Sequence, residues 1–382
     1  MKTILILSTE PWGKMLLSKM HYALELAESG NAVFFVNPPR KIKGKMLAQL
    51  STDHPAKNLK VINTKLIPGA LFLRHKIFRI YKILSANYTN QIKAIVDNPI
   101  NEVWCFDPFL YVDLKKFNAD KSILLIYDFY KEKIIFNTAT TADAVISISK
   151  PILDFYKAVD RPKLLLQHGL GSCFSKLATK QLVNENLKYE KRGKLKIGYV
   201  GNLLRAAINV DIAREIISKH TDKEFHFWGP YSLEENNVSP TDVSVSEELV
   251  SFIKYLQNQP NVILHGIMEQ ELLSEQLFTM DVFLFLYSAN KDINGASNSH
   301  KIIEYLSTGK AVVSTFISNY AEADLLIMSP MNDEHQVSEL FDQVTDNLQF
   351  YNSTEFQKKR ICFALDNTYR NQINRINKFI YN

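Results

Sequence analysis

The residues best suited to chemistry lie in one segment of the C-terminal third, NGASNSHKIIEYLSTGKAVVST, residues 294–315. Small and polar residues precede a helical pattern that begins near Asn298 or Ser299, and either residue could cap the helix. The free N–H groups and the positive dipole end of a helix N-terminus suit a phosphate. Lys301 in the first turn opposes that dipole unless an anion binds there. The segment therefore predicts an anion site at the start of this helix.

Glu304 adds a second chemical function to the same helix. It lies one turn after His300 and Lys301, on the same face. A carboxylate at such a position can accept both hydroxyls of a ribose, as acidic residues do in dinucleotide sites. The alternative is a solvated helix in which Lys301 and Glu304 contact each other, and the residue types alone leave this alternative open.

The segment resembles the nucleotide-sugar motif of GT-B glycosyltransferases, particularly the family-4-like group and its relatives in exopolysaccharide and teichuronic acid synthesis. Those enzymes often read S-N-x-K-x-x-E-Y-L-A-x-G-K-P-V-V-S-T at this place. Residues 297–315 here read SNSHKIIEYLSTGKAVVST. The resemblance is close and favours the nucleotide-sugar interpretation over the solvated helix.

The resemblance extends over most of the chain. Residues 198–202 (GYVGN) resemble the glycine-rich turn after the first strand of the donor domain, and Arg205 stands where the family often has a basic residue for the diphosphate. Residues 261–266 resemble a stretch whose backbone commonly packs on the base. The donor-binding residues that the resemblance implies are Gly201, Asn202, Arg205, Gly229, Gly266, Ile267, Asn298, Ser299, His300, Lys301 and Glu304.

Two departures from the family pattern concern the sugar and a turn. Many members have a second Glu eight residues before the ribose Glu, where this sequence has Ala296. That Glu normally contacts the donor sugar, so the usual retaining stereochemistry does not follow here. Residues 168–171, HGLG, replace the N-G-V-D pattern at the end of the acceptor domain. Because that motif is largely a turn, we assign no function to His168.

An inverting transferase would need a general base within hydrogen-bond reach of the acceptor hydroxyl. Asp128, at the end of the apolar run ILLIYD, is our first choice. It resembles the Y-D-x-x-D position of the exopolysaccharide-type relatives, although Lys131 replaces the second Asp. The alternative is that Asp128 caps the following segment and holds a loop.

Motifs of other enzyme classes are missing from the sequence. It contains no D-x-D, HExxH, GxSxG or GxxxxGK[ST] pattern, and its three cysteines lie far apart with no CxxC spacing. GT-B enzymes generally need no metal, because basic residues and a helix end neutralise the leaving diphosphate. We expect a metal-independent enzyme without a cofactor, using a UDP-sugar rather than a GDP-sugar as co-substrate.

The elements that must position these residues alternate between apolar runs and helical patterns. The runs are continuous, which suits strands buried on both faces of a parallel sheet. They cover residues 4–7, 32–37, 103–106, 123–128, 144–149 and 164–168, and then 195–201, 224–229, 262–266, 281–287, 311–315 and 325–328. This pattern predicts an α/β protein of the GT-B class, with two Rossmann-like doubly wound domains facing a central cleft.

The predicted domains follow from the polar stretch at residues 181–194, which we interpret as a linker. Residues 1–180 would form the acceptor-binding domain and residues 195–352 the nucleotide-sugar domain. Residues 353–382 have a helical pattern, and we expect this C-terminal helix to pack back on the first domain.

The charge is divided unevenly along the chain. Residues 1–180 carry 26 Lys/Arg and 14 Asp/Glu, whereas residues 181–382 carry 19 and 26. Most of the positive excess lies between residues 40 and 93, where residues 68–84 (PGALFLRHKIFRIYKIL) could form an amphipathic segment that contacts an anionic membrane. A solvated basic face is the alternative. We expect no nucleic-acid partner, because RNA-module signatures and interleaved stacking aromatics are missing.

The expected cellular location of the protein rests on its first residues and on the length of its apolar runs. The first residues form no signal-peptide pattern, and no apolar run reaches the ~18–20 residues needed to cross a bilayer. We expect a cytoplasmic protein, either free or at the inner face of the cell membrane.

The expected function is transfer of a sugar from a nucleotide sugar to a saccharide or lipid-linked saccharide, in surface polysaccharide synthesis of the bacterial type. One alternative is a catalytically silent GT-B protein that acts as a scaffold in a polysaccharide assembly complex. Another is an epimerase or phosphorylase of the same fold.

Overall fold

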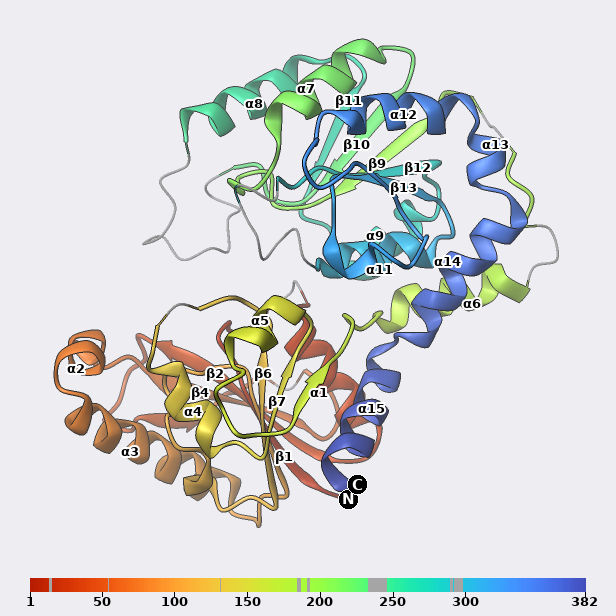
Figure 1. Ribbon diagram of the computed structural model, residues 1–382. Helices are drawn as coiled ribbons and strands as arrows, with labels where there is room; N and C mark the ends of the chain where they lie inside the picture. The colour runs from red at the N-terminus through yellow and green to blue at the C-terminus, as the bar shows by residue number, and fades with distance from the viewer. Residues whose placement is uncertain are drawn as a thin grey trace. The chain divides into compact units, whose positions relative to one another are not determined.

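The computed structural model describes residues 1–382 except 14–15, 54, 131, 184–186, 191–192, 233–245, 289–290 and 292–297 (Figure 1). The chain forms two compact units. Unit 1 comprises residues 1–167 and 369–382, and unit 2 comprises residues 168–368. Each unit is an α/β layer structure with its own sheet, as the alternating pattern predicts.

The described residues of unit 1 form an eight-stranded sheet in the order β3-β4-β2-β1-β5-β6-β7-β8. All neighbouring strands are parallel except β3 and β4. The strands are β1 (Thr3–Leu7), β2 (Ala32–Arg40), β3 (Ala48–Leu50), β4 (Leu59–Lys65), β5 (Glu102–Cys105), β6 (Lys121–Ile126), β7 (Ala144–Ser147) and β8 (Lys163–Leu165).

Helices cover both faces of this sheet because its strands are apolar on both sides. Leu5 and Leu7 pack in one core with α3, α4 and α5, whereas Ile4 and Ile6 pack in another with α1 and α15. The described helical segments of unit 1 are α1 (Ser18–Glu28), α2 (Ala70–Lys76), α3 (Phe78–Val96), α4 (Ile135–Thr141), α5 (Lys150–Phe155), α15 (Tyr369–Tyr381) and the 3-10 turn η1 (Leu114–Phe117).

Unit 2 contains a six-stranded, fully parallel sheet in the order β11-β10-β9-β12-β13-β14 among its described residues. The strand order reverses between β9 and β12, and ligands of open α/β sheets bind beyond the carboxyl ends at such a point. The strands are β9 (Lys196–Val200), β10 (Glu224–Trp228), β11 (Val262–Gly266), β12 (Val282–Phe285), β13 (Ala311–Ser314) and β14 (Ile327–Met328).

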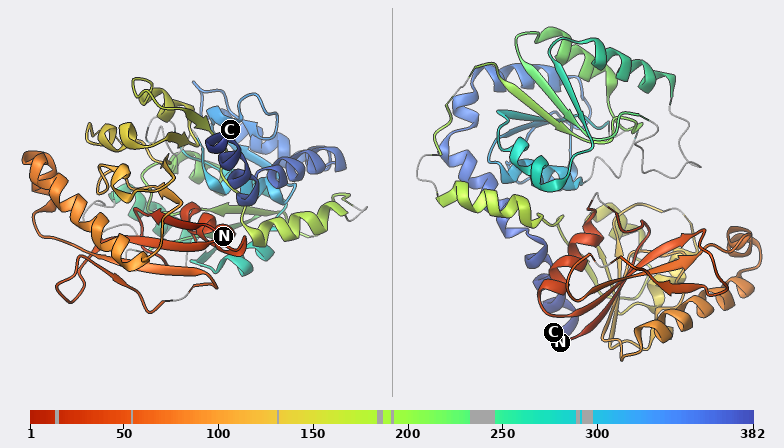
Figure 2. Two further views of the ribbon diagram at one scale, coloured as in Figure 1. Left: turned by 90° about the horizontal axis from the view of Figure 1, so that it is seen from below. Right: turned by 180° about the vertical axis from the view of Figure 1, so that it is seen from behind.

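The helices of unit 2 form two contacting groups, one on each face of the sheet (Figures 1 and 2). One group contains α7 (Val210–Lys219), α8 (Glu247–Asn258) and α12 (Gln336–Asp346). The other contains α6 (Ser172–Val183), α9 (Gln270–Leu277), α11 (His300–Ser307) and α14 (Thr354–Asp366). The short segments η3 (Ser318–Tyr320) and α13 (Leu348–Tyr351) complete the described elements.

Two strands of unit 1 were not predicted. β4 pairs with β2, and β3 pairs antiparallel with β4 at the sheet edge. Lys60, Asn63, Thr64 and Lys65 interrupt the apolar pattern of β4, so it lacks the continuous run by which the other strands were recognised. Val61 and Ile62 of β4 are nevertheless buried, because other elements of unit 1 pack on them.

The predicted linker at 181–194 differs from the structure. Residues 181–183 are the last turn of α6, and Leu187 and Tyr189 are buried in unit 2. The Gln357 amide donates a hydrogen bond to the Leu187 carbonyl at 2.5 Å, and the Tyr189 hydroxyl donates one to Asp281 at 3.0 Å. These two apolar anchors hold a mostly polar segment on unit 2, and the division between the units lies at residue 167 instead.

The predicted C-terminal helix is two helices that belong to different units. α14 contacts α6 and α11 in unit 2, and α15 contacts α1 in unit 1. Asn367 and Thr368 separate them, and the Asn367 carbonyl accepts a hydrogen bond from the Leu170 N–H at 2.7 Å. Only residues 369–382 therefore return to the first unit.

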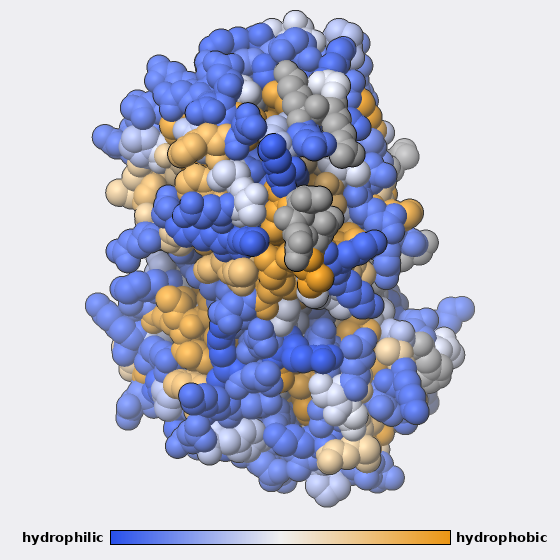
Figure 3. All heavy atoms as spheres, turned by 90° about the vertical axis from the view of Figure 1, so that its right-hand side faces the viewer, coloured by the Kyte–Doolittle hydropathy of each residue, from blue (hydrophilic) through white to orange (hydrophobic). Residues whose placement is uncertain are grey.

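Hydrophilic side chains predominate on the face drawn in Figure 3, with apolar side chains in smaller groups between them. In the described part of the chain, the helices are too short or too polar to pass through a bilayer.

Candidate functional site

Three of the predicted glycines lie next to one another at the carboxyl ends of β9, β10 and β11. The Gly201 N–H donates to the Trp228 carbonyl at 2.9 Å, and the Gly229 N–H donates to the Gly266 carbonyl at 2.8 Å. Gly229 has φ +125°, and a Cβ there would lie 2.1 Å from the Gly201 carbonyl oxygen. Only glycine permits this approach. The three loops therefore form one closely packed backbone platform.

The loop after β9 carries Asn202 and Arg205. The Asn202 side-chain oxygen accepts a hydrogen bond from the Leu204 N–H at 2.9 Å, which closes a tight turn. Arg205 is exposed, and its guanidinium lies 5.2 Å from the ring centre of Tyr287, just beyond β12. Arg205 is thus held across the point where the strand order of the sheet reverses.

The helix α11 is fixed to the end of β9 by Tyr305. The Val200 N–H donates to the Tyr305 hydroxyl at 2.6 Å, and the Tyr305 ring stacks on Phe283 with centroids 4.3 Å apart. Gly309 follows the helix in a left-handed conformation, with φ +76°, and its N–H donates to the Leu306 carbonyl. The Tyr and Gly of the motif thus have structural roles, and the Tyr305 hydroxyl holds α11 at the end of β9, directly before the loop that begins with Gly201.

The start of α11 contains Asn298, Ser299, His300 and Lys301. Asn298 and Ser299 are buried, and Ser299 is the N-cap residue, although its side chain makes no capping hydrogen bond. His300 and Lys301 are half-buried. Because no acidic residue occupies the first turn, the N–H groups and the Lys301 cation leave a positively charged helix end.

Glu304 is half-buried one turn further along α11. Burial raises the pKa of Glu304 to about 7, and the nearby Lys301 charge opposes this rise. Perturbed carboxyl groups of this kind are concentrated at functional sites. In the described part of the chain, Lys301 acts on Glu304 through its charge, without a hydrogen bond or ion pair between the two side chains.

His168 is a residue of this region that the sequence did not single out. Its buried ring lies 5.8 Å from the His300 ring, and it is hydrogen-bonded to the Asn298 backbone. Burial lowers the pKa of His168 to about 4, and the Lys301 charge adds to this effect. His168 therefore stands neutral beside the helix start. The available signal is its position after an apolar run, in a motif that we interpret as a turn.

An aromatic stack lies in the strands directly before Gly229 and Gly266. Trp228 and His265 are parallel with centroids 4.6 Å apart, and His226 stacks on both. After Gly266, Ile267 is 42% exposed, so its side chain is available for contact with a ligand. These rings were not predicted either. His226 and Trp228 lie two positions apart in β10, whereas His265 comes from β11.

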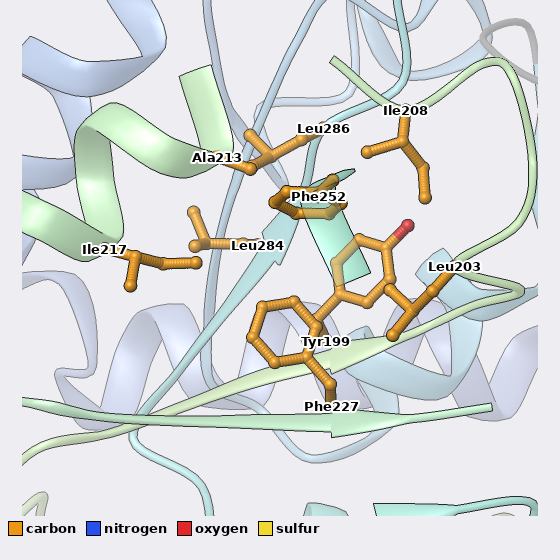
Figure 4. Close-up of a pocket in the computed structure, with 9 residues that line it drawn as sticks. All are labelled: Tyr199, Leu203, Ile208, Ala213, Ile217, Phe227, Phe252, Leu284 and Leu286. Carbon is orange, nitrogen blue, oxygen red and sulfur yellow. The ribbon is translucent and has the colours of Figure 1, made fainter. Parts of the chain in front are cut away.

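A separate pocket in unit 2 contains none of the predicted donor residues. It lies between the sheet and helices α7 and α8, and its only polar group is the hydroxyl of Tyr199 (Figure 4). The lining residues are Tyr199, Leu203, Ile208, Ala213, Ile217, Phe227, Phe252, Leu284 and Leu286. This space belongs to the packing of the core.

The proposed base, Asp128, lies in unit 1, two residues beyond the end of β6. It is exposed, and the Tyr130 hydroxyl is 3.5 Å from its carboxylate. Lys19 is buried nearby and pairs with Glu10, and burial lowers the pKa of Lys19 to about 8, an effect that the Asp128 charge partly offsets. Asp128 is thus accessible at the carboxyl edge of the sheet.

Asp107 differs from Asp128 in having a structural role. It is buried after β5, and its carboxylate accepts hydrogen bonds from the N–H groups of Phe109 at 2.9 Å and Leu110 at 3.1 Å. Burial raises the pKa of Asp107.

Part of the motif lies outside the described residues. Ala296 and Ser297 belong to it, so the structure does not bear on the missing second Glu. Within the described ranges, no group of three or more His, Cys, Asp or Glu residues is arranged to hold a metal ion.

No protein-family model matches the chain, and no curated protein matches it at a significant level. Solved structures match over its whole length. One, from E. coli, is described as trehalose-6-phosphate bound with UDP-2-fluoro glucose (11% identity, TM-score 0.70, 99% of each chain). A UDP-forming α,α-trehalose-phosphate synthase from Burkholderia xenovorans, in complex with glucose-6-phosphate, has 9% identity and a TM-score of 0.71 over 100% of both chains. The synthase from Burkholderia vietnamiensis has 10% identity and a TM-score of 0.69, over 98% of this chain and 96% of that one. These likenesses show that the chain has the two-domain GT-B fold of these synthases.

Proposed function

We propose that this protein is a glycosyltransferase that moves a sugar from a UDP-sugar to a saccharide or lipid-linked saccharide. The observation that carries the proposal is that Lys301 and Glu304 lie on α11, which Tyr305 holds at the end of β9, next to the point where the strand order of the sheet reverses. A helix end with a cation and a carboxylate one turn later offers partners for a diphosphate and a ribose.

All the predicted donor residues except Asn202, which closes the turn after β9, have a role in this proposal. Arg205, Lys301 and the N–H groups at Asn298–His300 would hold the diphosphate and neutralise the charge that develops as it leaves. Glu304 would accept the ribose hydroxyls, and Gly266 with Ile267 would lie against the base. The glycines at 201 and 229 would let the phosphates approach the backbone. This charge set needs no metal ion.

On the acceptor side, Asp128 is proposed as the general base of an inverting transfer. Its carboxylate would take the proton of the acceptor hydroxyl as that oxygen attacks the anomeric carbon and the bond to the diphosphate breaks. Its exposure at the carboxyl edge of the sheet supports this role. A retaining outcome would instead leave Asp128 as a binding residue.

The setting that we propose is surface polysaccharide synthesis in the cytoplasm, at the inner face of the membrane. The family-4-like resemblance and the excess of cations at residues 40–93 support it. The solved structures offer a different acceptor class, because one of the synthases holds glucose-6-phosphate. Nucleic acid is not a proposed partner.

The test is a transfer assay with radiolabelled UDP-sugars and two acceptor pools, a bacterial lipid extract and soluble sugar phosphates. We expect UDP release that depends on one acceptor pool and that is lost in Lys301→Ala. UDP binding without release of UDP under any condition would contradict the enzyme and favour the silent scaffold. Release of an epimer from the UDP-sugar alone would favour an epimerase.

A further inference from the structure

Helices α2 and α3 expose an unusual combination of apolar and basic side chains on unit 1. The apolar members are Leu71 and Phe72 on α2, 65% and 59% exposed, and Ile80 and Ile83 on α3, 47% and 63% exposed. The basic members are Lys76, Arg79 and Lys82, all exposed. The two helices contact each other, and α2 stands out from the rest of its unit (Figures 1 and 2). We call these seven residues the α2–α3 surface.

The arrangement follows from the helical repeat. Tyr81, Ser85 and Tyr88 on α3 are buried against unit 1. Arg79 and Lys82 are three residues apart on α3, and Ile80 and Ile83 form a neighbouring stripe with the same spacing. Lys76 is the last residue of α2, directly before the break at Ile77. Since α2 has no buried residue, its apolar side chains contribute little to the core.

The α2–α3 surface carries three positive charges, from Lys76, Arg79 and Lys82. Among the residues that the structure describes, no acidic side chain pairs with Lys76, Arg79 or Lys82. Residues 40–93 contain 12 Lys and Arg but one acidic residue, Asp53. The α2–α3 surface therefore suits a partner with a negatively charged outer layer and an apolar layer below it.

We propose that the α2–α3 surface docks on a bilayer that contains anionic lipids. Lys76, Arg79 and Lys82 contact the headgroups, while Leu71, Phe72, Ile80 and Ile83 enter the boundary with the acyl chains. Exposed leucine and isoleucine favour the bilayer over a nucleic acid, because aliphatic side chains offer no stacking face for bases.

A series of side-chain contacts joins α2 to Asp128, the candidate base. Arg74 on α2 pairs with Glu132 at 3.1 Å and lies 4.8 Å from the Phe109 ring centre. The Phe109 ring packs on Tyr130 at 4.8 Å, and the Tyr130 hydroxyl reaches Asp128. A docked α2 would therefore be joined to Asp128 through Arg74, Phe109 and Tyr130. Resting on the proposed function, this connection assigns a lipid-borne acceptor rather than a soluble sugar phosphate.

Vesicle co-sedimentation of the full chain tests the docking. We expect binding to phosphatidylglycerol vesicles, weak binding to phosphatidylcholine vesicles, and loss of binding as salt increases. The variant Lys76→Gln/Arg79→Gln/Lys82→Gln should bind phosphatidylglycerol roughly 100-fold more weakly, which corresponds to about 3 kcal/mol for three cations. The matched control Lys115→Gln/Lys116→Gln/Lys157→Gln removes three other exposed cations of unit 1 and should bind as the wild type does.

A second pair of variants separates a bilayer from a simple polyanion. Phe72→Ser should weaken vesicle binding about tenfold without a change in charge, whereas Leu165→Ser, 45% exposed elsewhere in unit 1, should not. Absent vesicle binding, equal losses in the control variants, or binding of RNA but not of vesicles would overturn the proposal. UDP titration of the same samples distinguishes the two proposals, because vesicle binding requires no nucleotide.

The acceptor class has its own readout in the transfer assay. Label from the UDP-sugar should partition into the organic phase with the lipid extract, and the triple variant at Lys76, Arg79 and Lys82 should lose this product while it still binds UDP. Transfer to glucose-6-phosphate alone, at equal rates in both proteins, would overturn the assignment of a lipid-borne acceptor.

Discussion

At the residue scale, α11 carries a basic side chain, Lys301, in its first turn and an acidic one, Glu304, one turn later. The Lys301 cation favours an anion at the helix start, whereas burial disfavours the charged form of Glu304 and raises its pKa to about 7. A ligand with a diphosphate and a vicinal diol would satisfy both groups. This pair therefore carries the predictions about donor binding.

Replacement of Glu304 by Ala should weaken UDP binding by about 1.5–3 kcal/mol, the value of hydrogen bonds to a charged group. The loss corresponds to roughly 10–150-fold in Kd. Isothermal calorimetry measures it directly. Glu322→Ala, which removes an exposed carboxylate of unit 2, is the control and should leave the Kd unchanged. Equal affinity of Glu304→Ala and wild type would remove Glu304 from the site.

The raised pKa of Glu304 predicts a pH dependence of donor binding. The carboxylate can accept from two ribose hydroxyls, so protonation as the pH falls through about 7 should weaken binding. UDP-glucose is the suitable probe, because its phosphate diesters do not titrate in this range. We expect about a tenfold loss of affinity from pH 8 to pH 6, and a flat profile in Glu304→Gln. Wild-type affinity that stays constant or rises toward pH 6 would contradict this role.

The sequence predicted Lys301 and Glu304 because their spacing on one helix face is a local property. His168 and the stacked rings of Trp228 and His265 could not be predicted in the same way. These residues contact each other or α11 only once the chain has folded. His168, for example, is 132 positions from His300 in the chain. Contacts between distant segments leave no periodic pattern in the sequence.

At the element scale, the loops after β9, β10 and β11 depend on one close backbone approach. Gly229→Ala should lower the free energy of unfolding by at least about 2 kcal/mol, because its φ is +125° and its Cβ would meet the Gly201 carbonyl. UDP binding should also weaken. Gly193→Ala is the matched control, since Gly193 has φ +75° with open space around it, and it should cost about 1 kcal/mol. Equal losses in denaturant titrations of the two variants would show that the approach is not strained.

Most strands were predictable because parallel strands covered on both faces must be continuously apolar. The edge strand β3 and its partner β4 do not need such a run, and they were missed. The ends of elements were less certain: the predicted strand 123–128 ends at Ile126, which leaves Asp128 in the following loop. The amphipathic segment at 68–84 is broken at Ile77 into α2 and α3.

At the scale of the whole molecule, the last 14 residues belong to the first unit although they follow the second. Ile373, Ile376 and Ile380 of α15 are buried with residues of α1 and β1. Composition could show that the C-terminal stretch is helical. It could not show that the helix divides at residues 367–368. The division depends on which unit the apolar faces of α14 and α15 pack against.

Ile376→Ala should therefore destabilise unit 1 by about 2–5 kcal/mol, the cost of a cavity at a fully buried isoleucine. Hydrogen exchange should show faster opening of β1 and α1, with unit 2 and UDP affinity unaffected. Ile212→Ala, at a fully buried site on α7, is the converse control. Faster exchange of α11 in Ile376→Ala would contradict the assignment of α15 to unit 1.

The central claim is that unit 2 binds a nucleoside diphosphate sugar, and calorimetric titration of the full chain with UDP, GDP, ADP and CMP, without added metal, tests it most directly. The account predicts one-to-one binding of UDP with a micromolar Kd, tighter than that of the other three nucleotides. Binding of none of them would contradict the claim and leave a GT-B fold without a donor site.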